Sequence, residues 1–275
     1  MHLGMTGEGF GFLIAMVIVA GLVAGFLSGL LGIGGGGILV PVLYETFGVA
    51  GVPEEIRMHL TLGTTLAVIA PTVLSSFSAH RARGSVDMAV VRRMGPWIVL
   101  GVTLGIMIAE HASSEALRWV WVVFGSLLAF KMALGRDEWR IADALPPPPK
   151  LEAASFGIGV ISTLMGIGGA TFTVPLLTLY GRPLLQSVAT ATGIGPMIAV
   201  PGIIGYMLTG WHAPGLPEFS AGYVSLAALL IAPLGVFAAP FGVRMAHGIS
   251  KRKLEVAFAI FITCVVARFL YTLVG

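Results

Sequence analysis

The stretch "LLGIGGGGILVPVL", residues 30–43, places five glycines within six positions of an otherwise apolar region. Each glycine in a helix interior costs about 1 kcal/mol relative to alanine, so this stretch predicts a helix that stops and starts again. A break inside a membrane leaves backbone N–H and C=O groups without partners, which is costly unless the open backbone lines a cavity. The glycines therefore indicate either a binding site or a place where helices pack closely.

The composition limits the class of protein. Of the 275 residues, 56% are hydrophobic and 11% are charged, and the mean hydropathy is +0.94. Soluble domains carry about 25% charged residues, so this chain lacks the polar surface to enclose its core in water. The sequence predicts an all-α membrane protein surrounded by a lipid bilayer. The net charge of +3 is small and gathered in a few loops, which favours a role in membrane orientation over nucleic-acid binding.

Apolar segments follow one another along the chain, and two of them are short. A full membrane span needs about 20 residues, but the segments 37–48 and 171–181 have far fewer, and each follows a glycine break. The stretch "GRDEWRIADALPPPPK" is charged and proline-rich, which predicts a semi-rigid linker. The expected segments are 10–31, 37–48, 58–79, 94–110, 116–134, 152–165, 171–181, 185–209, 223–244 and 251–273.

The two sides of the linker match each other at an offset of 134 residues, which indicates an internal repeat. The matches nearest the breaks are glycines and prolines: Gly32 with Gly166, Gly34 with Gly168, Gly35 with Gly169, and Pro41 with Pro175. We therefore expect a first transmembrane repeat over 1–136, a cytoplasmic linker over 137–151 and a second repeat over 152–275.

The positive charges predict how these repeats lie in the membrane. Lys and Arg gather at 80–93, in the linker and at 244–253, which places these segments in the cytoplasm by the positive-inside rule. Both termini are then outside the cell membrane, and each half has about five segments. Because that number is odd, the two repeats are inverted relative to each other, with their broken helices meeting near the midplane.

Each break is followed by the N-terminus of a half-helix, which favours an anion. The first N–H groups of a helix lack intrahelical acceptors, and the helix dipole adds about +0.5 charge there. Two such ends can bind an anion without an ionised side chain in the membrane. Thr171 stands where it could cap the second half-helix. The candidate binding residues at the breaks are Gly32, Gly34, Gly35, Gly36, Gly166, Gly168, Gly169 and Thr171.

Threonines recur after both breaks, in "HLTLGTT" (59–65) and "SVATATG" (187–193). Thr64, Thr65 and Thr192 are candidates to line the same pocket, although such hydroxyls in membrane helices often bond the carbonyl of the preceding turn instead. Lys131 and Arg268 are equivalent in the repeat, and each is either an anchor at the membrane surface or a substrate ligand. The sequence has no spacing typical of metal ligands or of a catalytic group, so we expect no catalytic residue, metal or cofactor.

Four motifs resemble those of the TauE/SafE sulfite exporter family over essentially the full length. They are "GLLGIGGGGILVPVL" (29–43), "LGTTLAV" (62–68), "SAHRARGSVD" (78–87) and "STLMGIGGATFTVPLL" (162–177). The resemblance implies a multi-pass protein that moves sulfite, sulfonates or other small sulfur-containing anions. By motif position it implies substrate contacts at Gly32, Gly34, Gly35, Thr64, Thr65, Gly166, Gly168, Gly169 and Thr192.

These observations together predict a transporter of a small anionic substrate, and not an enzyme. A membrane potential that is negative inside favours anion exit by about 2.3 kcal/mol per charge per 100 mV, so we expect export. Two alternatives stay open at this point, a passive anion channel and an intramembrane enzyme. The sequence does not indicate an oligomeric state.

Overall fold

The computed structural model describes residues 18, 21–23, 26, 35–134, 140–246 and 251–274. Within these residues the chain is almost entirely helical, with one sheet of two short antiparallel strands. The elements are α2 (Gly36–Val49), α3 (Glu54–Ala82), α4 (Met88–His111), α5 (Ser114–Leu134), α6 (Lys150–Met165), α7 (Ala170–Leu179), α8 (Leu184–Thr209), β1 (Ser220–Ala221), β2 (Val224–Ser225), the 3-10 helix η1 (Ala227–Leu230), α9 (Ile231–Ala246) and α10 (Lys251–Val274).

Five of the described helices are long and apolar enough to cross a membrane: α3, α4, α5, α8 and the Glu255–Val274 part of α10. Large apolar side chains point outward from them. Phe130 on α5 is 59% exposed, Leu208 on α8 is 69% exposed and Ile260 on α10 is 60% exposed. Extended apolar surface of this kind is rare on soluble monomers and is expected where lipid surrounds the protein. The prediction of an all-α membrane protein is confirmed.

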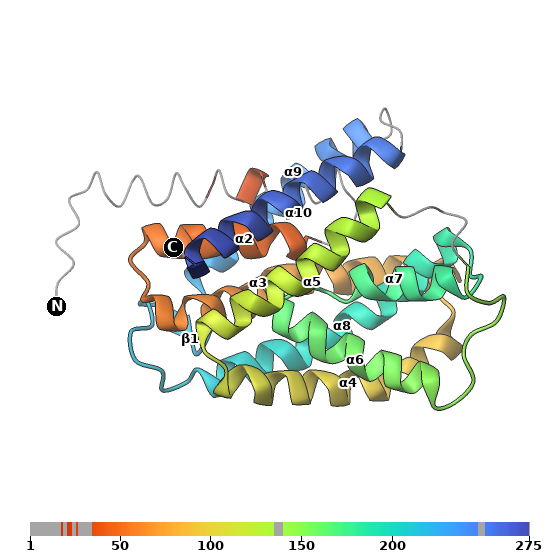
Figure 1. Cartoon of the computed structure of the whole chain (residues 1–275), viewed down its shortest axis with the longest axis horizontal. Coiled ribbons are helices and arrows are strands. Elements are labelled where there is room, and N and C mark those ends of the chain that lie inside the picture. Colours follow the sequence, from red (N-terminus) through yellow and green to blue (C-terminus); the bar gives the residue numbers. More distant parts are fainter. Residues whose placement is uncertain are drawn as a thin grey trace.

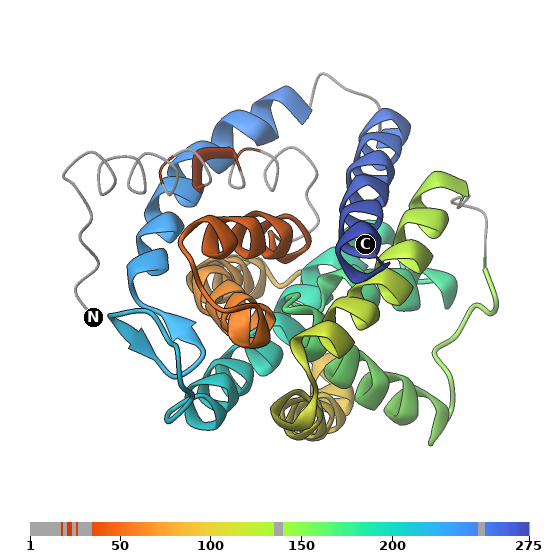
Figure 2. The ribbon, with the colours of Figure 1, turned by 60° about the vertical axis from the view of Figure 1, so that its left-hand side comes forward.

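The helices pack around α3, which contacts α2, α5 and α8 (Figures 1 and 2). Helix α5 pairs with α10, and α4 pairs with α6. The α4–α6 pair is close because both helices present glycine: a Cβ atom on Gly101 would lie 2.1 Å from the carbonyl oxygen of Phe156, and one on Gly159 would lie 2.3 Å from that of Ile98. Small residues allow this backbone contact between membrane helices.

The connections between helices gather at two opposite ends of the molecule. We call the first the Arg118 end. There the ion pair of Glu54 and Arg118 joins α3 to α5, and Arg118 also donates to the Thr272 carbonyl near the C-terminus. The connections at this end are 50–53, 112–113 and 210–226. In Figure 1 it lies at the left, near the label C.

We call the opposite end the Asp87 end. The ion pair of Asp87 with Arg182 joins the α3–α4 connection to the α7–α8 connection, with a shortest N–O distance of 3.6 Å. The linker meets the same end, because Ile141 N donates to the Leu179 carbonyl at 2.8 Å. The basic stretch 80–93 and the linker therefore lie together, as the sequence predicted, whereas the connections 50–53, 112–113 and 210–226 lie at the Arg118 end.

The segment expected at 223–244 differs from the structure. Its first residues form a hairpin in which Ser220 pairs with Ser225 and Ala221 pairs with Val224, and α9 begins only at Ile231. The hairpin turns at Gly222, whose φ of +57° favours glycine. The side chain of Thr64 on α3 holds it in place by accepting a hydrogen bond from Ser225 N at 2.9 Å.

Candidate functional site

The two short helices begin in the same way. The residue before α2 is Gly35, with φ +51°, and the residue before α7 is Gly169, with φ +77°. Neither helix start has a side-chain cap, so the expectation that Thr171 caps the second half-helix is wrong. Thr171 is already the second residue of α7, because the chain turns into the helix at the positive φ of Gly169, two residues before the expected cap.

The hydrogen bonds at the two helix starts also match. The Gly35 carbonyl accepts from Ile38 N at 3.1 Å and Leu39 N at 2.9 Å, and the Gly169 carbonyl accepts from Phe172 N at 3.2 Å and Thr173 N at 2.9 Å. The first two N–H groups of each helix precede these bonds and have no intrahelical acceptor. They belong to Gly36 and Gly37 of α2 and to Ala170 and Thr171 of α7.

The first helix start lies against the second break, which we call the second tip (residues 166–169). A Cβ atom on Gly36 would be 2.8 Å from the Gly166 carbonyl oxygen and 3.0 Å from the Cα atom of Ile167. From this contact α2 runs to the Arg118 end, where Gly48 lies against Arg57, and α7 runs to the Asp87 end. The two half-helices therefore start together and end at opposite ends of the molecule.

The second tip is packed against apolar side chains near the middle of α3 and of α8. A Cβ atom on Gly168 would lie 3.3 Å from Cδ1 of Ile69, and one on Gly169 would lie 2.3 Å from Cδ1 of Ile198. Gly166 and Gly169 both have positive φ, whereas Gly168 does not. The fold therefore requires glycine at 166 and 169, but at 168 the backbone conformation does not require it.

Two buried side chains donate hydrogen bonds to carbonyl groups that precede the second tip. Trp121 Nε1 donates to the Met165 carbonyl at 3.0 Å, and the Tyr206 hydroxyl donates to the Thr163 carbonyl at 3.1 Å. The C-terminus of a helix carries about −0.5 charge, so a broken helix brings a negative end as well as a positive end to the same place. These two donors offset part of the negative end of α6, next to the open amides of α7. Sequence reasoning missed both residues, since nothing in their spacing links them to 163–165.

The candidate threonines have different surroundings. Thr64 is buried and holds the hairpin through Ser225. Thr65 lies on the same face of α3 as Leu62 and Ile69, both of which contact the second tip, and its hydroxyl donates to the Thr61 carbonyl at 2.7 Å. Thr192 is half-buried and donates to the Ala189 carbonyl at 2.6 Å. Among the three, Thr65 is the residue whose helix face meets the tip.

Two of the predicted site residues, Gly32 and Gly34, lie outside the described residues, and the structure says nothing of them. The others fall into two groups. The breaks and half-helix starts bring together Gly35, Gly36, Gly166, Gly168, Gly169 and Thr171, with Thr65 on the face of α3 that meets the tip, while Thr64 and Thr192 take part in hydrogen bonds elsewhere. Within the described part of the chain, no group of three or more His, Cys, Asp or Glu residues could hold a metal ion.

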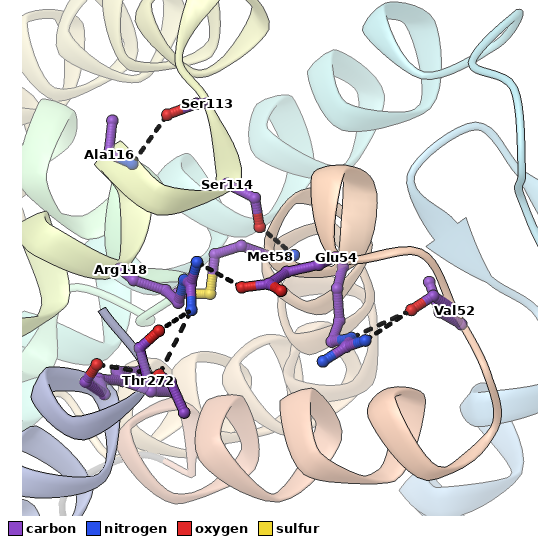
Figure 3. Close-up of polar contacts among 10 residues, drawn as sticks. Val52, Glu54, Met58, Ser113, Ser114, Ala116, Arg118 and Thr272 are labelled. Carbon is purple, nitrogen blue, oxygen red and sulfur yellow. Dashed lines mark hydrogen bonds and ion pairs between the residues drawn. The ribbon is translucent and has the colours of Figure 1, made fainter. Parts of the chain in front are cut away.

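A cluster of polar side chains joins the helices at the Arg118 end (Figure 3). Arg118 Nη2 lies 2.6 Å from Glu54 Oε1, and Nη1 donates to the carbonyl and hydroxyl of Thr272 at 3.4 and 3.3 Å. The side chain of Arg118 is only 5% exposed. Nearby, Arg268 pairs with Glu45 at 2.9 Å, which links α10 to α2 and gives Arg268 a protein partner. Lys131 is exposed near the last turn of α5.

These features define a multi-pass helical membrane protein in which two short helices, α2 and α7, each begin after a glycine. A model of the family described as "Sulfite exporter TauE/SafE" matches residues 17–269. A "probable membrane transporter protein" of Haemophilus influenzae is 31% identical over 253 residues, which cover 92% of this chain and 96% of that protein. Another, from Methanocaldococcus jannaschii, is 25% identical over 254 residues, covering 90% and 91%. No solved structure matches the chain.

The chain belongs to the TauE/SafE sulfite exporter family and is a membrane transporter. The family match extends across both glycine breaks and the linker between them. The resemblance inferred from the four motifs is thus confirmed, whereas the substrate, the direction of transport and the roles of the site residues are not given by these matches.

Proposed function

We propose that this protein exports a small sulfur-containing anion, such as sulfite or an organosulfonate, across the cell membrane. The observation that carries the proposal is the pair of uncapped half-helix N-termini after Gly35 and Gly169, the first of which lies against the second tip. Their four leading N–H groups and two positive dipole ends favour an anion. The candidate ligands are Gly32, Gly34, Gly35, Gly36, Thr64, Thr65, Gly166, Gly168, Gly169, Thr171 and Thr192.

The proposal includes two inverted repeats, over 1–136 and 152–275, joined by the linker 137–151. Supporting it, α2 and α7 begin at positions that keep the 134-residue offset, Gly36 and Ala170, and run to opposite ends. Helices α3 and α8 both follow a proline, Pro53 or Pro183, with nearly equal backbone angles. Inverted repeats around a central site are typical of alternating-access transporters. The Asp87 end, with its basic loops, is placed in the cytoplasm and both termini outside.

The direction follows from the membrane potential. A cell interior that is negative favours anion exit by about 2.3 kcal/mol per charge per 100 mV, so a sulfonate or sulfite needs no coupled ion to leave. Efflux of sulfite from loaded proteoliposomes should slow when valinomycin and potassium collapse an inside-negative potential. Efflux that ignored the potential but followed a pH gradient would contradict potential-driven export.

The site is tested by Gly168→Leu in the same vesicles. A leucine at 168 extends toward Ile69 and Val73 and adds bulk one residue before the Gly169 turn into α7, so saturable sulfite flux should be lost while the protein still inserts. The matched control is Gly157→Leu, because Gly157 on α6 has open space around its Cβ position. Normal sulfite binding by Gly168→Leu would show that the tip serves packing alone. An ion-like conductance of the wild type would indicate a channel instead of a carrier.

A further inference from the structure

Two buried hydroxyl groups beside the second tip have no hydrogen-bond partner among the described residues. They are Ser162 Oγ, in the last turn of α6, and Thr173 Oγ1, at the end of the first turn of α7. Both residues have an exposed fraction of 0%. A buried hydroxyl without a partner costs about 1–3 kcal/mol, so each of these groups calls for a physical explanation.

Other helical hydroxyls of this protein avoid the cost by bonding to the carbonyl four residues earlier. Thr65, Ser155 and Thr163 all do so, at 2.7 to 2.9 Å. The fold itself does not need a hydroxyl at position 173 either, because the residue at the matching position of α2 is Leu39, which is also buried. A valine at 173 would avoid the penalty, so the hydroxyl must have another use.

Both residues lie in the helix turns that flank the second tip, and helix geometry directs the Thr173 side chain toward the α7 N-terminus. Thr173 N bonds to the Gly169 carbonyl, which places Thr173 one turn into α7. Side chains on a helix tilt toward its N-terminus, so Oγ1 of Thr173 leans back toward the open amides of Ala170 and Thr171. The Ser162 carbonyl accepts from Ile167 N at 2.9 Å, so Ser162 belongs to the turn that closes the tip from the α6 side.

We propose that Ser162 and Thr173 donate their hydroxyl hydrogens to the oxygen atoms of an anion with an SO3 group, held at the α7 N-terminus. A positive helix end and two O–H groups without protein acceptors fit a ligand that only accepts hydrogen bonds. Because the donors approach from two helices, they match several oxygens on one centre better than a single spherical halide. This inference rests on the proposed function and adds two ligands to its site, together with selectivity for an oxyanion over chloride.

The test compares Thr173→Val and Ser162→Ala with Thr178→Val in proteoliposomes and in detergent. Thr178 is on the same helix, and its hydroxyl already bonds to the Val174 carbonyl at 3.1 Å. We expect the dissociation constant for sulfite to rise about tenfold to a hundredfold in each of the first two variants, as for loss of one hydrogen bond to a charged group. Chloride competition should strengthen in the same variants, Thr178→Val should bind like the wild type, and Thr173→Ser should restore affinity.

If the hydroxyls of Ser162 and Thr173 bind no ligand, the experiment gives a different result. Thr173→Val and Ser162→Ala would then melt at a higher temperature than the wild type, because a buried unsatisfied group is removed, and would bind sulfite and methanesulfonate unchanged. That outcome overturns the inference and leaves the proposed function standing. A wild-type protein that neither binds nor moves any sulfur anion overturns both.

Discussion

Trp121 and Tyr206 provide the sharpest test of how a broken helix becomes an anion site. We expect Trp121→Phe and Tyr206→Phe to weaken sulfite binding even though neither side chain is assigned a contact with the anion. Each change frees a carbonyl group at the negative end of α6, beside the α7 amides. The freed partial negative charge opposes an anion bound there.

The two changes should differ in size, because the two carbonyls differ in their remaining partners. The Thr163 carbonyl keeps a second donor, Gly166 N at 3.2 Å, whereas Trp121 is the donor that the structure records for the Met165 carbonyl. Hydrogen bonds between membrane helices average about 0.6 kcal/mol and reach about 1.7 kcal/mol. We therefore expect the dissociation constant to rise about threefold for Tyr206→Phe and roughly tenfold to twentyfold for Trp121→Phe.

The assay is equilibrium binding of sulfite to purified, monodisperse protein, with flux in proteoliposomes as a second readout. Trp119→Phe is the matched control for Trp121, since Trp119 lies on the same helix and is 40% exposed. Tyr180→Phe serves the same purpose for Tyr206, since Tyr180 is half-buried and its hydroxyl has no hydrogen bond recorded within the described residues. Wild-type affinity in a well-folded Trp121→Phe protein would refute the reasoning, since the α6 carbonyls would then have no influence on the site.

Three further predictions concern stability and are measured as shifts of the thermal midpoint in detergent. Gly169→Ala should destabilise the protein by about 1–2 kcal/mol from the positive φ of Gly169 alone, with a further cost from the contact with Ile198. Gly157→Ala should be neutral or stabilising. Equal thermal midpoints of the two variants would contradict the positive φ at Gly169. Glu54→Gln should cost about 1–3 kcal/mol, because it removes the carboxylate from the buried Arg118, and a wild-type midpoint would disprove this pairing. Arg93→Met should lower the midpoint by breaking the bonds of Arg93 to the Glu152 carboxylate and the Pro146 carbonyl. If the linker were no more sensitive to protease in this variant, Arg93 would not be what holds the linker in place.

Much of the fold could be predicted because it depends on local composition and periodicity. The glycine runs mark both short helices to within two residues at each end, since the conformational cost of glycine is a property of the residue itself. The grouping of the basic loops at the Asp87 end follows from charge alone. The hairpin at 220–225 was missed, because its strands have only two residues each and depend on a distant partner, Thr64.

Less of the candidate site could be predicted from the sequence, because the site depends on contacts between distant segments. Trp121 lies 44 residues from the carbonyl that it saturates, and the repeat pattern gives no hint of that bond. Thr64 matched the repeat, yet its side chain serves the hairpin. Thr173, by contrast, stood inside the quoted motif and was passed over, since a sequence does not reveal which hydroxyls find a partner.

The far ends of the two half-helices complete the electrostatic argument. Each carries a negative dipole end, and each meets donors from elsewhere in the chain. At the end of α2, the guanidinium group of Arg57 lies beside Gly48 and donates to the Val52 carbonyl. At the end of α7, Ile141 N of the linker donates to the Leu179 carbonyl at 2.8 Å. Both negative ends are therefore offset at the surface, and Trp121 and Tyr206 offset the Met165 and Thr163 carbonyls of α6. The α7 amides and two unpaired hydroxyls are the donors at the second tip. These donors favour a ligand that only accepts hydrogen bonds, and a fully ionised oxyanion is such a ligand.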